Sequence, residues 1–166
     1  MRGARPVLLT LGLAIVALVI QATLFRRFHW LVPDLVVLVV ILSSLTLRPE
    51  AALLAGFLAG AVVDVSLGSS LLGLRALTYT VVAFLASRSR QRADAGPLAV
   101  AVWAGGLTLA AVTVLLLVGL LFGQSAELGG QMLRRLILVP LSNALLAALL
   151  AGPLTRSLER AARRAA

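Results

Sequence analysis

Long apolar runs separated by short polar segments make up nearly the whole sequence. A helix that crosses a membrane needs about 20 apolar residues, at a rise of about 1.5 Å per residue. The runs therefore predict an all-α fold, a single integral membrane domain over residues 1–166 that forms a helical bundle with about six transmembrane helices. The helices are expected at about 6–25, 33–47, 49–65, 71–87, 97–122 and 131–155.

The second predicted helix has a clear start signal. Pro33 is tolerated in a first turn, and the Asp34 carboxylate can accept hydrogen bonds from the free backbone N–H groups there. The helix ends before Arg48, where Pro49 opens the next helix. At about 14 residues it is short for a membrane span. Either it begins earlier, within 28–31, or it enters the membrane at an angle.

Charge gives the expected orientation. The chain is 61% hydrophobic and carries a formal net charge of +9, with 15 basic residues, all arginine, against six acidic ones. Cytoplasmic segments of membrane proteins are enriched in arginine and lysine. With six helices, ten arginines fall on one side and four on the other: Arg2, Arg5, Arg48, Arg88, Arg90, Arg92, Arg156, Arg160, Arg163 and Arg164 against Arg26, Arg27, Arg134 and Arg135. We therefore expect a multi-pass protein of the bacterial cytoplasmic (inner) membrane with both termini in the cytoplasm.

Composition also excludes several kinds of chemistry. The arginines lie beside anionic lipid rather than on a basic soluble surface, so we expect contacts with membrane lipid and none with nucleic acid. The chain has no cysteine and one histidine, His29, and it lacks the HExxH, GxSxG, P-loop and GxGxxG patterns. The sequence therefore predicts no metal, no cofactor and no enzymatic activity.

Small residues line one face of the third predicted helix. Ala52, Gly56, Gly60 and Asp64 follow one another at a stride of four, which places them on the same side. Small residues let helix backbones approach closely in lipid, where apolar burial no longer drives association. This pattern predicts a helix-packing face, whose partner is either another helix of this chain or another protein.

Asp64 continues that face, and Arg75 lies just inside the fourth helix, across a short turn. A charge at membrane depth is costly and usually finds a partner inside the protein. We expect a structural ion pair that fixes the hairpin between the third and fourth helices. The alternatives are a proton or solute site, or an Asp64 exposed at the membrane interface.

Three further charged residues are candidate partner contacts: Arg134, Arg135 and Asp34. The two arginines lie at the start of the last helix, on the side that receives few positive charges. Either their long side chains reach the membrane interface, or they bind a carboxylate. Asn143, in the middle of the same helix, is expected to hydrogen-bond between helices, with solute binding as the alternative.

The order of these features resembles the rod shape-determining protein MreD family. In that family a Pro-Asp pair opens the second helix, and a G-F-x-x-G-x-x-x-D segment, here Gly56 to Asp64, leads to a stretch matching Gly68 to Leu77. The resemblance implies a non-enzymatic membrane scaffold of the cell-elongation (rod) complex. This subunit would bind MreC and, with it, RodA and its class B penicillin-binding transpeptidase, and so support lateral peptidoglycan synthesis and cell shape.

Two observations limit what the resemblance implies. Arg75 stands where the family often has histidine, so a proton-linked role is not carried over to that position. The family fold also resembles the substrate-binding S components of energy-coupling-factor vitamin transporters, which gives an alternative function. A ligand pocket needs convergent polar groups on an apolar wall, and few such residues are present in this chain.

Overall fold

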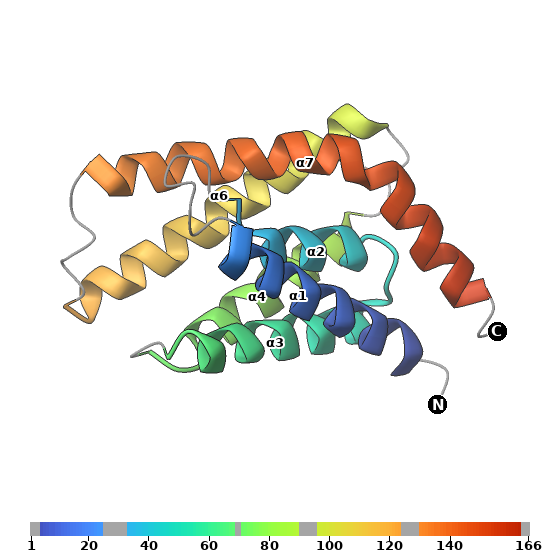
Figure 1. Cartoon of the computed structure of the whole chain (residues 1–166), viewed down its shortest axis with the longest axis horizontal. Helices are drawn as coiled ribbons and strands as arrows, with labels where there is room; N and C mark the ends of the chain where they lie inside the picture. Colours follow the sequence, from blue (N-terminus) through green and yellow to red (C-terminus); the bar gives the residue numbers. More distant parts are fainter. Residues whose placement is uncertain (1–3, 25–32, 69–70, 90–95, 124–129, 164–166) are drawn as a thin grey trace.

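A computed structural model describes residues 4–24, 33–68, 71–89, 96–123 and 130–163, which contain six helices and no strands. The all-helical prediction is therefore confirmed. The helices are α1 (Ala4–Leu24), α2 (Leu35–Ser44), α3 (Pro49–Ser66), α4 (Leu74–Arg88), α6 (Pro97–Leu121) and α7 (Gly130–Arg163). Figure 1 shows that α7 lies along one edge of the bundle and α3 along the opposite edge.

Four of the six helices are long and apolar enough to cross a membrane, which identifies a multi-pass membrane protein. The spans are Arg5–Thr23, Pro49–Ser66, Pro97–Leu121 and Met132–Leu150. The other two helices are shorter, with 10 residues in α2 and 15 in α4. At about 1.5 Å per residue, α2 covers about 15 Å, roughly half of a typical hydrocarbon core.

The short helix α2 forms the centre of the bundle. Eight of its ten residues are buried, including both serines at its end, Ser43 and Ser44. It packs against α1, α3, α4, α6 and α7, and Figure 1 shows it in the middle of the molecule. A helix that is apolar all round is stable when protein surrounds it on every side. The apolar residues of α2 therefore serve as core rather than as a lipid-facing surface.

The small-residue face of α3 packs against α4. A Cβ atom added to Gly56 would lie 2.6 Å from the carbonyl oxygen of Tyr79, and one added to Gly60 would lie 2.5 Å from the Cα of Ala76. Ala52, one turn earlier on the same face, is fully buried. The helix against the two glycines thus belongs to this chain, and their lack of a side chain sets the distance between α3 and α4.

Helices α6 and α7 form a second closely packed pair. A Cβ atom added to Gly105 of α6 would lie 3.0 Å from the Cβ of Ala144 in α7. Helix α7 continues to Arg163, beyond the expected end at about residue 155. Figure 1 shows that its last part, in red, turns away from the direction of the rest. The long α6–α7 pair covers one side of α2, and the α3–α4 pair covers another.

Candidate functional site

Asp64 lies at the end of α3, and its carboxylate serves the start of α4. The side chain is 2% exposed. Its Oδ2 accepts hydrogen bonds from the backbone N–H groups of Gly73 (2.9 Å), Arg75 (3.1 Å) and Ala76 (3.2 Å). The first N–H groups of a helix have no partner within it, and a negative charge is stabilised there. Because Gly73 has no side chain to cap α4, Asp64 caps it from the neighbouring helix.

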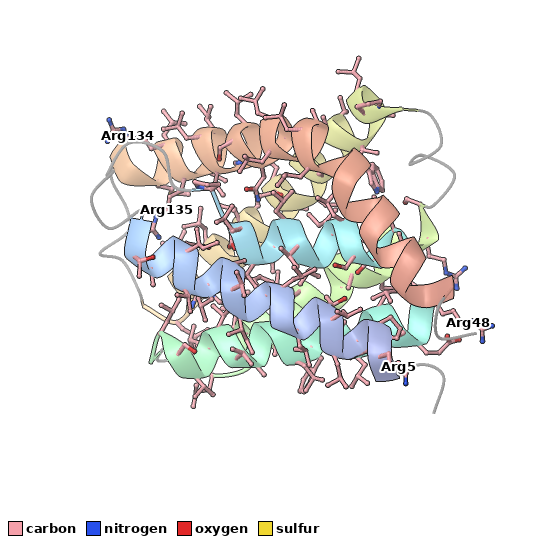
Figure 2. The ribbon with its side chains drawn as sticks, turned by 45° about the vertical axis from the view of Figure 1, so that its right-hand side comes forward. Arg5, Arg48, Arg134 and Arg135 are labelled. Carbon is pink, nitrogen blue, oxygen red and sulfur yellow. The ribbon has the colours of Figure 1, made fainter. Side chains whose placement is uncertain are left out.

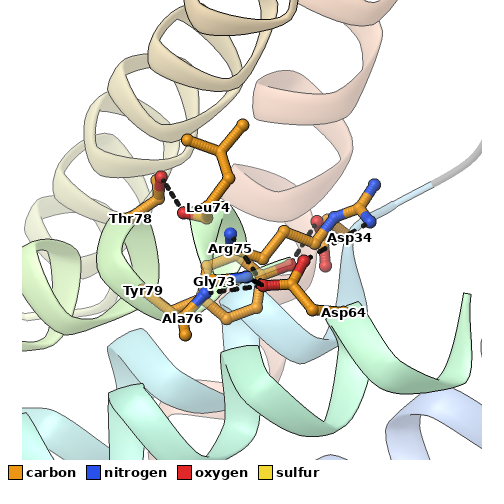
Figure 3. A network of polar contacts seen from close by, with 8 residues as sticks. All are labelled: Asp34, Asp64, Gly73, Leu74, Arg75, Ala76, Thr78 and Tyr79. Atoms are coloured by element: carbon orange, nitrogen blue, oxygen red, sulfur yellow. Dashed lines mark hydrogen bonds and ion pairs between the residues drawn. The ribbon is translucent and has the colours of Figure 1, made fainter. Parts of the chain in front are cut away.

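Arg75 lies beside this carboxylate at a greater distance. Its Nη1 is 4.0 Å from Asp64 Oδ1, and the arginine side chain is 30% exposed. Figure 3 shows the guanidinium extending past Asp64 toward Asp34. The structure thus brings the two residues of the expected ion pair together, but the short contacts of Asp64 are with the backbone of α4.

Asp34 occupies the start of α2, as its sequence position predicts. Its Oδ1 accepts a hydrogen bond from the backbone N–H of Val37 at 3.1 Å, so the expected helix cap is confirmed. Its Oδ2 accepts a hydrogen bond from the hydroxyl of Tyr79, also at 3.1 Å. Tyr79, the chain's one tyrosine, is buried in α4 and belongs to none of the motifs found in the sequence. A lone buried tyrosine needs a partner for its hydroxyl, and that need was the available signal.

Two further helices hold the start of α2. Gln21 of α1 accepts a hydrogen bond from the backbone N–H of Leu35 through its Oε1 at 3.1 Å. Asn143 of α7 donates through Nδ2 to the carbonyl oxygen of Asp34 at 3.0 Å and to Oγ1 of Thr108 in α6 at 3.2 Å. Asn143 therefore makes the hydrogen bonds between helices that its position suggested. The start of α2 is the point where polar groups from α1, α4, α6 and α7 meet.

The two other candidate contact residues lie apart from this cluster. Arg134 and Arg135 are exposed near the start of α7. In Figure 2, Arg134 points away from the bundle. Other residues considered from the sequence lie outside the described residues or side chains, namely Arg2, Arg26, Arg27, His29, Arg90, Arg92, Arg156, Arg160, Arg163 and Arg164.

The chemistry available to the cluster is the stabilisation of helix ends. Both carboxylates are used to accept hydrogen bonds from backbone N–H groups, and Asp34 also accepts one from a hydroxyl. Among the described residues, no three His, Cys, Asp or Glu side chains lie close enough together to hold a metal ion. Figure 3 shows the cluster bridging the start of α2, the end of α3 and the start of α4.

Comparison with known proteins identifies the family. No curated protein and no solved structure gave a match. The family model described as rod shape-determining protein MreD matches residues 1–159 of the 166-residue chain. The match extends well beyond the Pro-Asp and glycine motifs, over the first five helices, most of α7 and the polar cluster between them. The chain therefore belongs to the MreD family of rod shape-determining membrane proteins.

Proposed function

We propose that this chain is a non-enzymatic scaffold subunit of the bacterial cell-elongation complex. It binds MreC in the cytoplasmic (inner) membrane and, with MreC, holds RodA and its class B penicillin-binding transpeptidase where lateral peptidoglycan synthesis takes place. The observation that carries this proposal is the family match over nearly the whole chain. A subunit of this complex is expected to belong to a family of shape-determining membrane proteins, as this chain does.

The polar cluster supports a structural role. Asp64 holds the start of α4, and Asp34 holds the start of α2. These carboxylates fix the relative positions of α2, α3 and α4, as a scaffold needs.

The proposed orientation follows from the arginines. With both termini in the cytoplasm, α2 begins and α3 ends on the outer side, so Asp34 and Asp64 lie in the outer half of the bundle. Arg48 and Arg88, at the start of α3 and the end of α4, then face the cytoplasm, in agreement with the enrichment of arginine in cytoplasmic segments. The family match favours this scaffold over the vitamin-transporter alternative.

Affinity purification from native membranes tests the proposal. The tagged chain is extracted in a mild detergent, and co-purifying proteins are identified by mass spectrometry, with an unrelated tagged six-helix protein as the control. Recovery of MreC together with RodA and the transpeptidase is the expected result. Recovery of a pair of ATP-binding cassette proteins with a coupling protein would contradict the scaffold and support the transporter alternative.

A further inference from the structure

Helix α7 contains a proline, Pro140, at the point where its surroundings change. We propose that residues 132–139, which we call the α7 arm, move about Pro140 as a hinged segment while the following part of α7 stays fixed to the bundle. The movement changes the spacing between the end of α6 and the start of α7 and leaves α2, α3 and α4 in place. This inference goes beyond the proposed function and does not depend on it.

The two sides of Pro140 differ in burial. Among the described side chains, none from 132 to 139 is buried, and Leu133 and Ile137 are 64% and 54% exposed. From 140 to 147 the buried residues are Pro140, Ser142, Asn143 and Ala147. Segments with few buried side chains move at a lower free-energy cost than the core. Lipid chains cover apolar side chains wherever the α7 arm lies, so its apolar surface does not fix its position.

The part of α7 that follows the proline is tied to two other helices. Asn143 donates through Nδ2 to the carbonyl oxygen of Asp34 at 3.0 Å and to Oγ1 of Thr108 at 3.2 Å. Next to it, Ala144 packs so closely on α6 that a Cβ atom added to Gly105 would lie 3.0 Å from the Ala144 Cβ. These contacts hold α7 against α2 and α6. Bending therefore takes place before them, at the proline.

The buried part of α6 ends at the same level. The bond between Thr108 and Asn143 gives the register of the two antiparallel helices. Three residues further along α6 and three residues back along α7, Ala111 and Pro140 lie at one level, and both are buried. Beyond it, from 112 to 121, only Gly119 is buried among the described residues. Figure 1 shows that the end of α6 and the start of α7 lie well apart.

The chemistry of this turn lowers the cost of bending. Pro140 has no backbone N–H, so the usual helix hydrogen bond from residue 140 to the carbonyl oxygen of Leu136 cannot form. Sharp changes of direction in helices occur at such prolines. The Ser142 hydroxyl donates to the carbonyl oxygen of Val139 at 3.0 Å, a kind of bond that also bends helices. Both features lie between the α7 arm and the fixed part of α7.

Distances between paired spin labels test the hinge. The chain has no cysteine, so pairs of labelled cysteines can be placed in the full chain, in lipid nanodiscs, without other changes. The arm pair joins Leu133 to Val65, near the end of α3, and the core pair joins Leu149 to Leu54; all four side chains are exposed. By double electron–electron resonance we expect the distance distribution of the arm pair to be about twofold wider than that of the core pair.

Two proline substitutions test the position of the hinge. Pro140→Ala supplies an N–H group for the missing helix bond, so the distribution of the arm pair should narrow about twofold, to the width of the core pair. Pro97→Ala is the matched control. Pro97 lies in the first turn of α6, where backbone N–H groups have no partner within the helix, so this change should leave both widths as they are.

Each outcome decides one part of the inference. Equal widths of the arm and core pairs would overturn the hinged arm, and this comparison needs no change at Pro140. A wide arm distribution that persists in Pro140→Ala, or an equal narrowing in Pro97→Ala, would overturn the role of Pro140. Because the measurement uses this chain alone, its result is separate from whether MreC co-purifies with the chain.

Discussion

At the scale of single residues, the hairpin between α3 and α4 depends on Asp64 more than on Arg75. Three backbone N–H groups donate to the Asp64 carboxylate, whereas the guanidinium is 4.0 Å away and partly exposed. We expect Asp64→Ala to cost about 3 kcal/mol of stability, because buried donors lose their acceptor. Arg75→Ala should cost less than about 1 kcal/mol. Melting temperatures of the purified variants in detergent measure both. Equal losses would show that the ion pair dominates.

A charge swap separates the two roles of Asp64 more sharply. If the pair with Arg75 were its main function, exchanging the residues as Asp64→Arg with Arg75→Asp would restore folding. We expect no recovery, because an arginine at position 64 cannot accept the N–H groups of α4. Expression level and a monodisperse size-exclusion profile report the outcome. Wild-type behaviour of the double variant would contradict the capping role.

Tyr79 gives a second prediction at this scale. Tyr79→Phe removes the hydroxyl that donates to Asp34 Oδ2 and leaves the ring in place. We expect a loss of about 1–2 kcal/mol, because a half-buried carboxyl oxygen loses its hydrogen-bond donor. The matched control is Thr78→Val in the same helix, because the Thr78 hydroxyl donates to the carbonyl oxygen of Leu74 within α4 rather than to another helix. Thermal stability in detergent should fall more for Tyr79→Phe than for the control; the reverse order would contradict the account.

At the scale of helices, Gly60 sets the distance between α3 and α4. A Cβ atom there would lie 2.5 Å from Ala76 Cα and 2.6 Å from its backbone nitrogen, neither of which can rotate away. We expect Gly60→Ala to cost about 2–3 kcal/mol by forcing the helices apart. Gly12→Ala in α1 is the control, since an added Cβ meets no atom within 4 Å. Heating followed by size-exclusion chromatography measures the folded fraction, and equal behaviour of the two variants would refute close packing at Gly60.

The sequence predicted the six helices because each depends on a local pattern of apolar residues and helix start signals. It did not predict that α2, with 10 residues, lies at the centre of the bundle with protein around it. An apolar run of that length has the same sequence pattern whether lipid or protein covers the helix. About six membrane spans were predicted, and four helices are long and apolar enough to cross a membrane. The other two, α2 and α4, have 10 and 15 residues.

The candidate site was also predicted unevenly. Asp34 was identified because a cap acts on N–H groups three residues away in its own helix. Asp64 and Arg75 were expected to lie together because opposite charges flank a short turn, and their nearest charged atoms are 4.0 Å apart. The sequence could not show that Asp64 caps α4, because the cap depends on how the turn brings three backbone N–H groups to one carboxylate oxygen. Tyr79 and Gln21 act across helices, which no local pattern reveals.

At the scale of the whole molecule, the fold combines a closely packed interior around α2 with a pair of long helices, α6 and α7, that pack on this interior along one part of their length. The polar cluster and the α3–α4 contact hold α2, α3 and α4 together, and the family match extends over both parts. This arrangement suits a protein whose interior is unchanged while it positions others. Each scaffold molecule supports one set of bound partners at a time, so its effect depends on how many copies are present. One copy of an enzyme or a transporter acts on many molecules in turn.

The most direct test of the scaffold is therefore the dependence of lateral peptidoglycan synthesis on the amount of this protein. Its expression is lowered in steps in its native cell, and incorporation of a labelled cell-wall precursor along the side wall is measured together with the amount of MreC-bound protein. The account predicts that incorporation falls in proportion to the bound protein, with loss of rod shape. Incorporation that stays unchanged until only a small fraction of the protein remains would contradict it.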